Sequence, residues 1–437
     1  MSHYMPYPAY KDSGVDWAPE IPVHWDVKRL RFVASLNPLP AWKDLEGQGA
    51  DCPFLPMEAI GEAGELDTTR RKPIGECRSG YTYFAEGDVA YAKVTPCFEN
   101  GKGAVMRGLE GGHGFGTTEL TVLRPISIDR DYLYALTFAE SFRQPGAAEM
   151  LGTGGLKRVP DEFARNYRAA LPPREEQSAI TAAIDRETSS IDALIAKKTR
   201  FIELLQEKRQ ALITHAVTKG LAPNVKLKDS GVGWIGEVPE HWEIVPSAWL
   251  FAEGKERAHA DDEHLSATQK YGVIPLAEYE RLEERQVTHA TMNLEQRKHV
   301  ELGDFVISMR SFEGGIERVK ARGCVRSSYV VLHAEAGVNV DFFAYLFKSS
   351  RYIQGLQATS SFIRDGQDLS YGNFRQVKLP LPGVEEQCNI ARVIGKTVGR
   401  IDMLTAATQR SIDLLKERRS AFITAAVTGQ IDLREAA

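Results

Sequence analysis

The chain contains the same plan twice, and this internal duplication constrains its fold more than any other feature. Residues 11–25 read KDSGVDWAPEIPVHW and return at residues 228–242 as KDSGVGWIGEVPEHW, an offset of 217. A second pair lies at an offset of 210, where residues 175–218 end in RQALITHAVT and residues 385–428 end in RSAFITAAVT. A period this long is typical of a duplicated domain and not of an array of short repeats. We therefore expect two equivalent halves.

The segments between the shared parts, about 26–170 and 243–380, have little sequence in common. Shared parts suggest one task carried out twice, and variable parts suggest two different targets. The predicted division of the chain is a first variable domain at 1–173, a first long helix at 174–220, a second variable domain at 221–383, and a second long helix with a C-terminal tail at 384–437.

Each variable domain is followed by a predicted long helix. Residues 177–219 contain no Gly or Pro and are rich in good helix formers, so the helix would extend about 65 Å. A helix with one apolar stripe needs a partner, and the globular domain between the two copies favours their antiparallel pairing. The stripes are formed by Ile180, Ile184, Ile191, Leu194, Phe201, Leu205 and Leu212, and by Ile390, Ile394, Ile401, Leu404, Leu415 and Phe422.

Two ordinary amphipathic core helices are the alternative to a coiled coil. Prolines before each EEQ predict where the helices begin, and Gly220 and Gly429 predict where they end. Gly395 and Gly399 would weaken the first turns of the second helix, so its firm part is predicted to begin near Arg400.

The variable domains mix short strands with turns and at least one helix, in the same order in both copies. The fold class is therefore α/β. Two globular α/β domains alternate with two long helices that pair as an antiparallel coiled coil, and the chain has an internal pseudo-two-fold repeat. The duplicated opening motif is expected to supply packing anchors and structural hydrogen bonds, from Trp17, Trp25, Trp234 and Trp242 and from His24 and His241.

Composition excludes several classes of protein. No apolar run reaches the length of a membrane span, and the N-terminus does not resemble a signal peptide, so we expect a cytoplasmic protein. The five cysteines form no C-x-x-C pair, which argues against a zinc site or a disulfide framework, and no metal or cofactor is expected. The net charge of −5 counts against nucleic-acid binding, although an acidic scaffold can carry a local basic surface.

Two motifs give the sequence a more specific likeness. YAKVTPCFENGKGAVM at 91–106, followed by GFGTTELTVLRP at 114–125, resembles the target recognition domains of type I restriction-modification specificity subunits. The opening motif and the proline-rich segment before each EEQ are similar to that family too. The second domain keeps GDFVISMRSFEGG at 303–315 but lacks the TPCFENG core, which makes its contact residues harder to assign.

This resemblance implies a DNA reader that is not itself an enzyme. Each recognition domain would read one half of a bipartite site in double-stranded DNA, and the paired helices would set the spacer between the halves. The helices would also dock modification (methyltransferase) subunits, two in number, and restriction (motor-nuclease) subunits would join for cleavage.

DNA contact requires cations for phosphates and hydrogen-bonding side chains for base edges. Arg pairs with guanine, and Asn or Gln pairs with adenine, which makes Asn100, Arg310, Arg364 and Gln367 the candidates for base reading. The full set of predicted DNA-binding residues is Arg70, Arg71, Lys93, Asn100, Lys102, Thr153, Lys157, Arg158, Arg310, Arg322, Arg326, Arg364 and Gln367.

Two other functions compete with this interpretation. A DNA-acting enzyme finds little support, because Asp51-Cys52-Pro53-Phe54 is only faintly similar to a methyltransferase loop and no phosphate-binding loop is present. A scaffold with a coiled coil and two protein-binding domains fits the duplication equally well. The Arg, Lys, Asn and Gly content of the variable domains favours DNA, and a steep loss of affinity with salt would distinguish the two.

Overall fold

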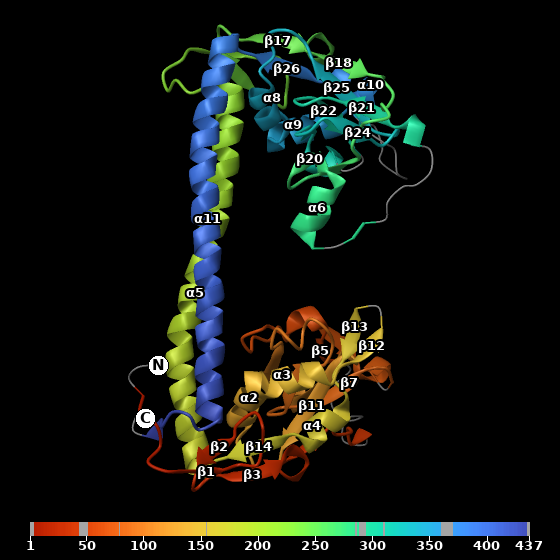
Figure 1. The fold of residues 1–437 in the computed structure, drawn as a ribbon. Helices are drawn as coiled ribbons and strands as arrows, with labels where there is room; N and C mark the ends of the chain where they lie inside the picture. Colours follow the sequence, from red (N-terminus) through yellow and green to blue (C-terminus); the bar gives the residue numbers. More distant parts are fainter. Residues whose placement is uncertain are drawn as a thin grey trace. The chain divides into compact units, whose positions relative to one another are not determined.

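The computed structural model describes residues 4–42, 51–77, 79–153, 155–284, 286–287, 294–308, 311–359 and 370–434. Their contacts divide the chain into unit 1, residues 1–199 and 409–437, and unit 2, residues 200–408. Two long helices, α5 (Arg174–Lys219) and α11 (Val384–Val427), each contribute one part to both units (Figure 1).

Unit 1 contains two four-stranded sheets and several two-stranded pairs. One sheet has the order β4-β11-β8-β9 and the other the order β6-β5-β10-β7. The strands are β1 (Tyr10–Asp12), β2 (Glu20–Pro22), β3 (Asp26–Arg29), β4 (Ala34–Leu36), β5 (Asp51–Leu55), β6 (Arg71–Pro73), β7 (Thr82–Ala85), β8 (Val89–Ala92), β9 (Gly103–Val105), β10 (His113–Gly116), β11 (Leu120–Pro125), β12 (Leu151–Thr153), β13 (Leu156–Arg158) and β14 (Arg168–Leu171). The shorter helices are α2 (Arg130–Phe138), α3 (Glu140–Ala148) and α4 (Asp161–Asn166), with 3-10 turns η1 (Leu30–Phe32), η2 (Met57–Ala59), η3 (Ile74–Cys77) and η4 (Glu110–Gly112).

Unit 2 repeats this plan with one four-stranded sheet, β18-β25-β22-β23, in the place of β4-β11-β8-β9. Its strands are β15 (Leu227–Asp229), β16 (Glu237–Pro239), β17 (Glu243–Pro246), β18 (Phe251–Gly254), β19 (Leu265–Thr268), β20 (Gly272–Pro275), β21 (Lys298–Val300), β22 (Phe305–Ile307), β23 (Glu317–Arg318), β24 (Gly323–Val325), β25 (Val330–Ala334) and β26 (Lys378–Leu381). The helices are α6 (Leu276–Glu283), α7 (Ser311–Gly314), α8 (Val340–Phe347), α9 (Ser350–Gln357) and α10 (Tyr371–Gln376), with η5 (Ser247–Trp249) and η6 (Leu294–Gln296).

The predicted antiparallel helix pair is confirmed within each unit. In unit 1 the first part of α5 and the last part of α11 share a core that includes Ile180 and Phe422. In unit 2 the last part of α5 and the first part of α11 share a core that includes Ile213 and Ile390. Each long helix therefore presents its N-terminal part to the C-terminal part of the other (Figure 1).

The two units repeat one ion pair between the long helices. Arg419 Nε lies 3.0 Å from Asp192 Oδ1 in unit 1, and Arg209 Nε lies 3.2 Å from Asp402 Oδ1 in unit 2. Both members of the second pair follow from the first at the 210-residue offset of the helices. The ion pair is therefore part of the duplicated design.

Two details of the helix prediction were wrong. The second helix begins at Val384, as the prolines before EEQ predict, but its turns before Arg400 are not weak. Ile390 and Ile394 are fully buried in the core of unit 2, and this packing outweighs the low helix propensity of glycine. The predicted stripe is also broken, since Leu194, Phe201 and Leu404 are between 43% and 50% exposed. The glycine stops are confirmed: Gly220 and Gly429 both have φ of 72°.

The junction between the long helices and the second short helix differs between the units. In unit 1 the Glu140 N–H at the start of α3 donates to Thr424 Oγ1 at 3.0 Å. Ser420 Oγ donates to the Glu140 carboxylate at 3.2 Å, and Arg143 Nη2 donates to Ser420 Oγ at 2.9 Å. Helix α3 is thereby fastened to α11.

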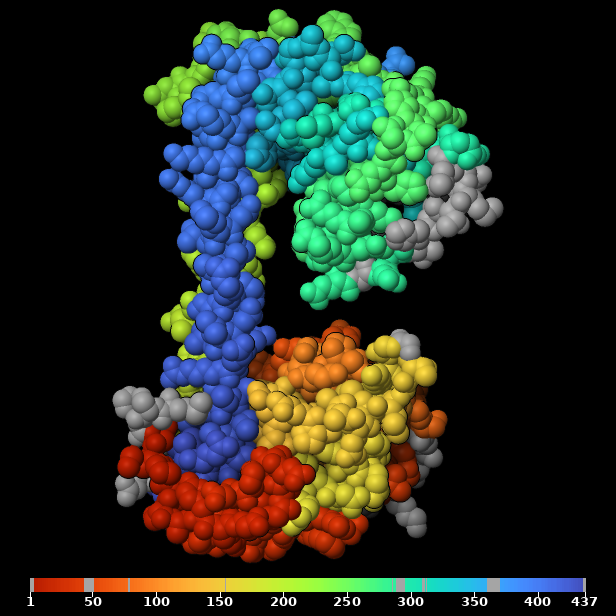
Figure 2. Space-filling view, viewed as in Figure 1, coloured from red at the N-terminus to blue at the C-terminus, as the bar shows by residue number. Residues whose placement is uncertain are grey.

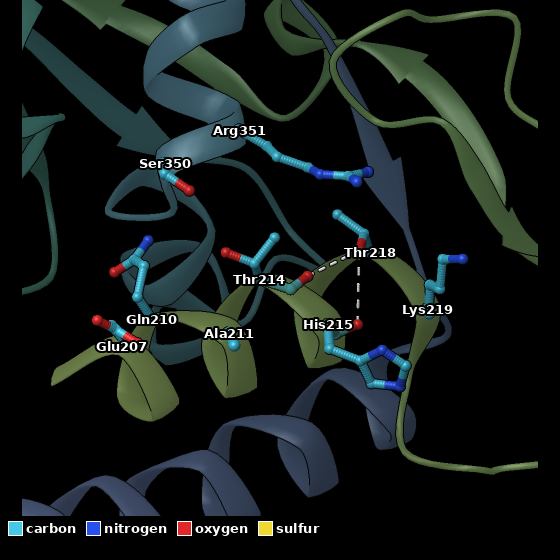
Figure 3. Close-up of a pocket in the computed structure, with 9 residues that line it drawn as sticks. All are labelled: Glu207, Gln210, Ala211, Thr214, His215, Thr218, Lys219, Ser350 and Arg351. Atoms are coloured by element: carbon cyan, nitrogen blue, oxygen red, sulfur yellow. Dashed lines mark hydrogen bonds between the residues drawn. The ribbon is translucent and has the colours of Figure 1, made fainter. Parts of the chain in front are cut away.

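Among the described residues of unit 2, the equivalent side chains do not form this fastening, and Gln210 Nε2 donates instead to the Lys348 carbonyl at 3.5 Å. The offset of 210 puts Ser350, Gln210 and Thr214 where unit 1 has Glu140, Ser420 and Thr424. A groove of about 660 Å³ lies between α5 and α9 there (Figure 3). Within the described part of the chain, Thr214 Oγ1 is buried without a hydrogen-bond partner.

Among the described residues, no helix combines the length and the apolar character needed to cross a membrane.

Candidate nucleic-acid interface

A buried glutamate fixes the variable domain of unit 1 to its long helix. Glu176, in the first turn of α5, accepts hydrogen bonds from Tyr7 Oη at 2.8 Å and Trp25 Nε1 at 3.0 Å, and it contacts His24 Nε2 at 2.8 Å. Burial and the hydrogen bond to Glu176 raise the pKa of the Tyr7 phenol well above its ordinary value. The opening motif is therefore a mount for α5, and the predicted structural roles of Trp25 and His24 are confirmed.

Unit 2 builds the same mount from the second copy of the motif. Glu386 accepts a hydrogen bond from Trp242 Nε1 at 3.1 Å and contacts His241 Nε2 at 2.9 Å. Trp25 and Trp242 are both fully buried. The remaining anchors also pack: Trp17 stacks on Tyr167, and Trp234 meets the edge of Tyr352.

The glutamine of each EEQ holds a short helix in place. Gln177 Oε1 accepts the N–H of Asp129, the residue that caps α2, at 2.8 Å. Gln387 Oε1 accepts the N–H of Asn339, which caps α8, also at 2.8 Å. Because the mount and the cap recur in both units, each variable surface is carried on the same rigid base.

Four of the predicted DNA contacts come together in unit 1 on a hairpin at the end of β8. Strands β12 and β13 form this hairpin, which carries Thr153, Lys157 and Arg158, and all six of its strand residues are exposed. Lys93 lies beside it, since the Val159 N–H donates to the Lys93 carbonyl at 2.8 Å. Figure 1 shows the hairpin projecting at the edge of unit 1, and Figure 2 shows the same region in yellow on the surface.

Arg158 is held in one orientation by an acid. Its Nε and Nη2 donate to the two carboxylate oxygens of Glu119 at 2.8 and 2.7 Å. This hydrogen bonding lowers the pKa of Glu119 and raises that of Arg158. Two of the five guanidinium N–H groups are thus used, and a preset arginine of this kind is suited to reading a base edge.

A second group of predicted contacts surrounds η2. Arg70 pairs with Glu58 at 2.7 Å, Lys102 Nζ donates to the Met57 carbonyl at 3.0 Å, and Asn100 Nδ2 donates to Glu62 at 3.0 Å. The backbone hydrogen bond of Glu58 and its hydrogen bond to Arg70 lower the pKa of the Glu58 carboxyl. Arg71 lies apart from this group and pairs with Glu110.

In unit 2, Arg322 belongs to an ion-pair network. Its Nη1 lies 3.2 Å from Asp261 Oδ2, and its Nε lies 3.6 Å from Glu301 Oε1. Arg326 is exposed in the turn between β24 and β25. The structure therefore does not bring Arg322 and Arg326 onto a hairpin like that of unit 1. Arg310, Arg364 and Gln367 lie outside the described residues.

The same network contains the chain's one group of potential metal ligands within the described residues. The ligand atoms of His259, Asp262 and His299 lie within 4.8 Å of one another. However, His299 Nδ1 is 2.8 Å from Asp262, His299 Nε2 is 3.0 Å from Glu301, and the two imidazole rings are stacked with centroids 4.2 Å apart. A metal ion lies in the plane of each imidazole that binds it, so stacked rings suit an ion-pair network better than a metal centre.

Sequence reasoning missed the acids that fix the cations and the two leucines beside them. Glu119 is 39 residues from Arg158 in the chain, so only the fold could pair them. Leu151 and Leu156 of the hairpin are 70% and 57% exposed. The signal for the leucines was present in LGTGGLKR, where two apolar residues flank a glycine-rich turn next to two cations.

Comparison with known proteins identifies relatives at the sequence level. No family model matches the chain. It is 37% identical over 198 residues to the EcoEI specificity subunit of a type I restriction enzyme from Escherichia coli, covering 44% of this chain and 33% of the relative. It is 22% identical over 440 positions to the putative type I restriction enzyme MjaX specificity subunit of Methanocaldococcus jannaschii, covering 95% of both chains.

The match to the EcoEI relative, like that to the EcoAI specificity subunit of Escherichia coli, spans a third of the relative's length. Among solved structures, the fold is similar to a chain from work on the complex assembly and conformational transition of the type I R-M system. The TM-score is 0.66 at 17% identity, over 94% of this chain and 99% of the other. This likeness shows that the two chains share a fold over nearly their whole lengths.

Proposed function

The chain belongs to the specificity subunits of type I restriction enzymes, and from this premise we propose that it is the DNA-reading subunit of such an enzyme. Each variable domain, 1–173 and 221–383, reads one half of a bipartite site in double-stranded DNA. The duplicated contacts of Glu176 and Glu386 present two different surfaces on one shared base. The observation that favours DNA over a protein partner is the exposed hairpin of unit 1, which carries Lys157 and Arg158.

The hairpin of unit 1 is the proposed site of base and phosphate contact. Lys93 and Lys157 supply charge for phosphates, and Arg158, fixed by Glu119, is directed at a base edge. Arg70, Asn100 and Lys102 around η2 form a second contact. For unit 2, the proposed DNA contacts are the exposed Arg326 and the Arg322 of the ion-pair network. The proposed contacts from Arg310, Arg364 and Gln367 rest on the sequence alone.

The long helices, 174–220 and 384–437 with the tail, are the proposed dock for the modification subunits, of which we propose two. Several large apolar side chains on these helices remain exposed, as does much of the surface of α11 in Figure 2. They are Leu194 and Leu414 in unit 1, and Phe201, Leu204, Met403 and Leu404 in unit 2. Motor-nuclease subunits would join this complex for cleavage.

In this proposal the subunit performs no chemistry of its own and works in the cytoplasm, where the DNA is. Methyl transfer and cleavage belong to the other subunits.

Methylome sequencing of cells with and without the gene tests the proposal. We expect one bipartite methylated motif, with a degenerate middle of fixed length, to disappear when the gene is deleted. If no motif changes, the binding of the purified chain to DNA across a salt series decides, since affinity for DNA falls steeply with salt. A chain that binds no DNA at low salt would be a scaffold, and the proposal would be wrong.

Substitutions then assign each domain to its half-site. Arg158→Ala should weaken binding by about 5- to 150-fold through one half-site only, because a base-reading arginine contributes about 1–3 kcal/mol. Arg364→Ala should act on the other half-site. Duplexes with one half-site scrambled at a time measure this, and an equal effect on both halves would contradict the assignment.

A further inference from the structure

The hairpin of unit 1 leaves two leucines in solvent at its projecting edge. Leu151 and Leu156 are 70% and 57% exposed, although both lie in regular β-strands. Exposed leucines forgo the free energy that burial would provide. Single exposed apolar residues are ordinary, but two on one ribbon form a patch that points to a contact outside the unit.

The strand register puts both leucines on the same face. Leu151 is opposite Arg158, Thr153 is opposite Leu156, and Gly152 is opposite Lys157. In an antiparallel pair, opposed residues and alternate residues project to one side. Leu151, Thr153, Leu156 and Arg158 therefore share a face, which we call the leucine face, and Lys157 projects from the other.

The hairpin is a rigid mount for this face. The Thr95 N–H donates to the Lys157 carbonyl at 2.9 Å, and the Lys157 N–H donates to Thr95 Oγ1 at 3.1 Å. Gly152 has φ of 144°, and a Cβ there would lie 2.4 Å from the Leu156 carbonyl oxygen, so only glycine fits. The two strands are thus held closely together and tied to the end of β8.

We propose that the leucine face enters the major groove of the half-site read by unit 1, where Leu151 and Leu156 contact the C5 methyl groups of thymines. The proposal rests on the proposed function. A two-stranded ribbon fits the major groove, and the thymine methyl is the apolar feature that this groove displays. Arg158 on the leucine face, Lys157 on the opposite face of the same ribbon and Lys93 beside it favour DNA over an apolar protein surface as the occupant.

Deoxyuridine provides a direct probe, because it differs from thymidine only by the missing methyl. The full chain would be titrated with duplexes of its methylome-defined site in which single thymines are replaced by deoxyuridine. For the wild type we expect a loss of about fourfold in affinity at one or more thymines of this half-site, the amount expected for one buried methyl group. Thymines of the other half-site should be insensitive to Leu151 and Leu156.

The double variant Leu151→Ala/Leu156→Ala completes the cycle. It should bind the thymine duplex more weakly than the wild type, and deoxyuridine should then cause no further loss. Lys157→Ala should weaken both duplexes equally and keep the deoxyuridine effect. Ile126→Ala, which alters a 64% exposed residue elsewhere in unit 1, should change neither.

Four results would overturn the inference. The wild type could be indifferent to deoxyuridine, the leucine variant could retain the full effect, or the half-site could contain no thymine in either strand. A leucine variant that binds DNA normally but no longer assembles with modification subunits would identify a protein contact instead. Failure of the proposed function looks different, since the wild type would then not distinguish its site from a scrambled duplex.

Discussion

At the scale of single residues, Glu176 and Glu386 form equivalent hydrogen bonds but differ in how far they are exposed to solvent. The side chain of Glu176 is 7% exposed and has three hydrogen-bonding neighbours, Tyr7, His24 and Trp25. The side chain of Glu386 is 33% exposed and contacts His241 and Trp242. Since water screens and replaces hydrogen bonds at exposed sites, the two glutamates should differ in their contribution to stability.

Glu176→Gln should therefore destabilise the chain by about 1.5–3 kcal/mol, the usual range for a buried hydrogen bond to a charged group. Glu386→Gln should cost clearly less, because its carboxylate is partly solvated. Urea unfolding of the two variants beside the wild type measures the difference. Equal losses would mean that the carboxylate charge matters little and that packing of the tryptophans carries the mount.

The pKa of His299 leads to a prediction of how the stability of unit 2 depends on pH. Burial by itself would lower the pKa of this imidazole, but hydrogen bonds to Asp262 and Glu301 outweigh burial and raise it above its ordinary 6.5. A raised folded-state pKa gives stability that is fully present below pH 6.5 and is lost as the pH rises through the folded-state pKa.

The free energy of unfolding of His299→Gln should therefore fall furthest below that of the wild type near pH 6. The difference between the two free energies should shrink as the pH is raised into the alkaline range. Urea unfolding of both proteins at a series of pH values tests this. A difference that stays constant with pH would show that His299 is not protonated in the folded chain.

The candidate site shows where residue-level prediction from sequence ends. Arg158 and Lys157 could be selected because cations next to a glycine-rich turn are typical of DNA contacts. Their acidic partners could not, because Glu119 and Arg158 meet only when β11 and the hairpin are assembled. For the same reason, sequence alone could not show that Arg322 is engaged by Asp261 and Glu301.

At the scale of elements, periodicity predicted the long helices and their antiparallel pairing, since both depend on local pattern and duplication. It failed at Gly395 and Gly399, where burial of neighbouring residues keeps the helix intact. It also failed to separate buried from exposed apolar positions, such as Leu205 and Leu194. An apolar residue of a helix pair is buried only where the α/β domain also covers that side of the pair. The spacing of apolar residues in the sequence does not show which side is covered.

The open junction of unit 2 offers an element-scale prediction based on its closed counterpart. Replacing Gln210 with Ser and Ser350 with Glu copies the residues that fasten α3 to α11 in unit 1. We expect α9 to close on α5 and the buried Thr214 hydroxyl to gain a partner. The gain should be about 1 kcal/mol, or about 2–4 °C in melting temperature.

Differential scanning calorimetry of the full chain measures this change. Ser350→Glu alone is the control, because without the serine the new carboxylate lacks the hydroxyl that donates a hydrogen bond to it in unit 1. A double variant that melts at or below the wild-type temperature would show that the groove of Figure 3 is not closed by these two residues alone.

At the scale of the whole chain, the long helices link the two proposed DNA-reading domains, and in this proposal their length sets the distance between half-sites. Asp192 and Arg209 are 17 residues apart in α5, and Asp402 and Arg419 are 17 residues apart in α11. Deletions of equal length between these residues in both helices therefore leave each ion pair intact in its own unit. Removing residues 197–203 from α5 and 408–414 from α11 takes out about two turns from each helix and about 10 Å of length. A deletion of seven residues removes very nearly two helical turns. The residues on either side of it therefore stay on nearly the same face of the helix, and the contact between α5 and α11 is preserved in each unit.

If the helices are the ruler, this doubly shortened chain should accept a spacer about three base pairs shorter, at about 3.4 Å per base pair, while both half-sites stay the same. Methylome sequencing of cells that carry only the shortened gene gives spacer and half-sites together. Deletion in α5 alone is the control, because it offsets the helices against each other and should abolish methylation. An unchanged spacer in the matched deletion would mean that contacts outside the helices hold the two readers at their distance.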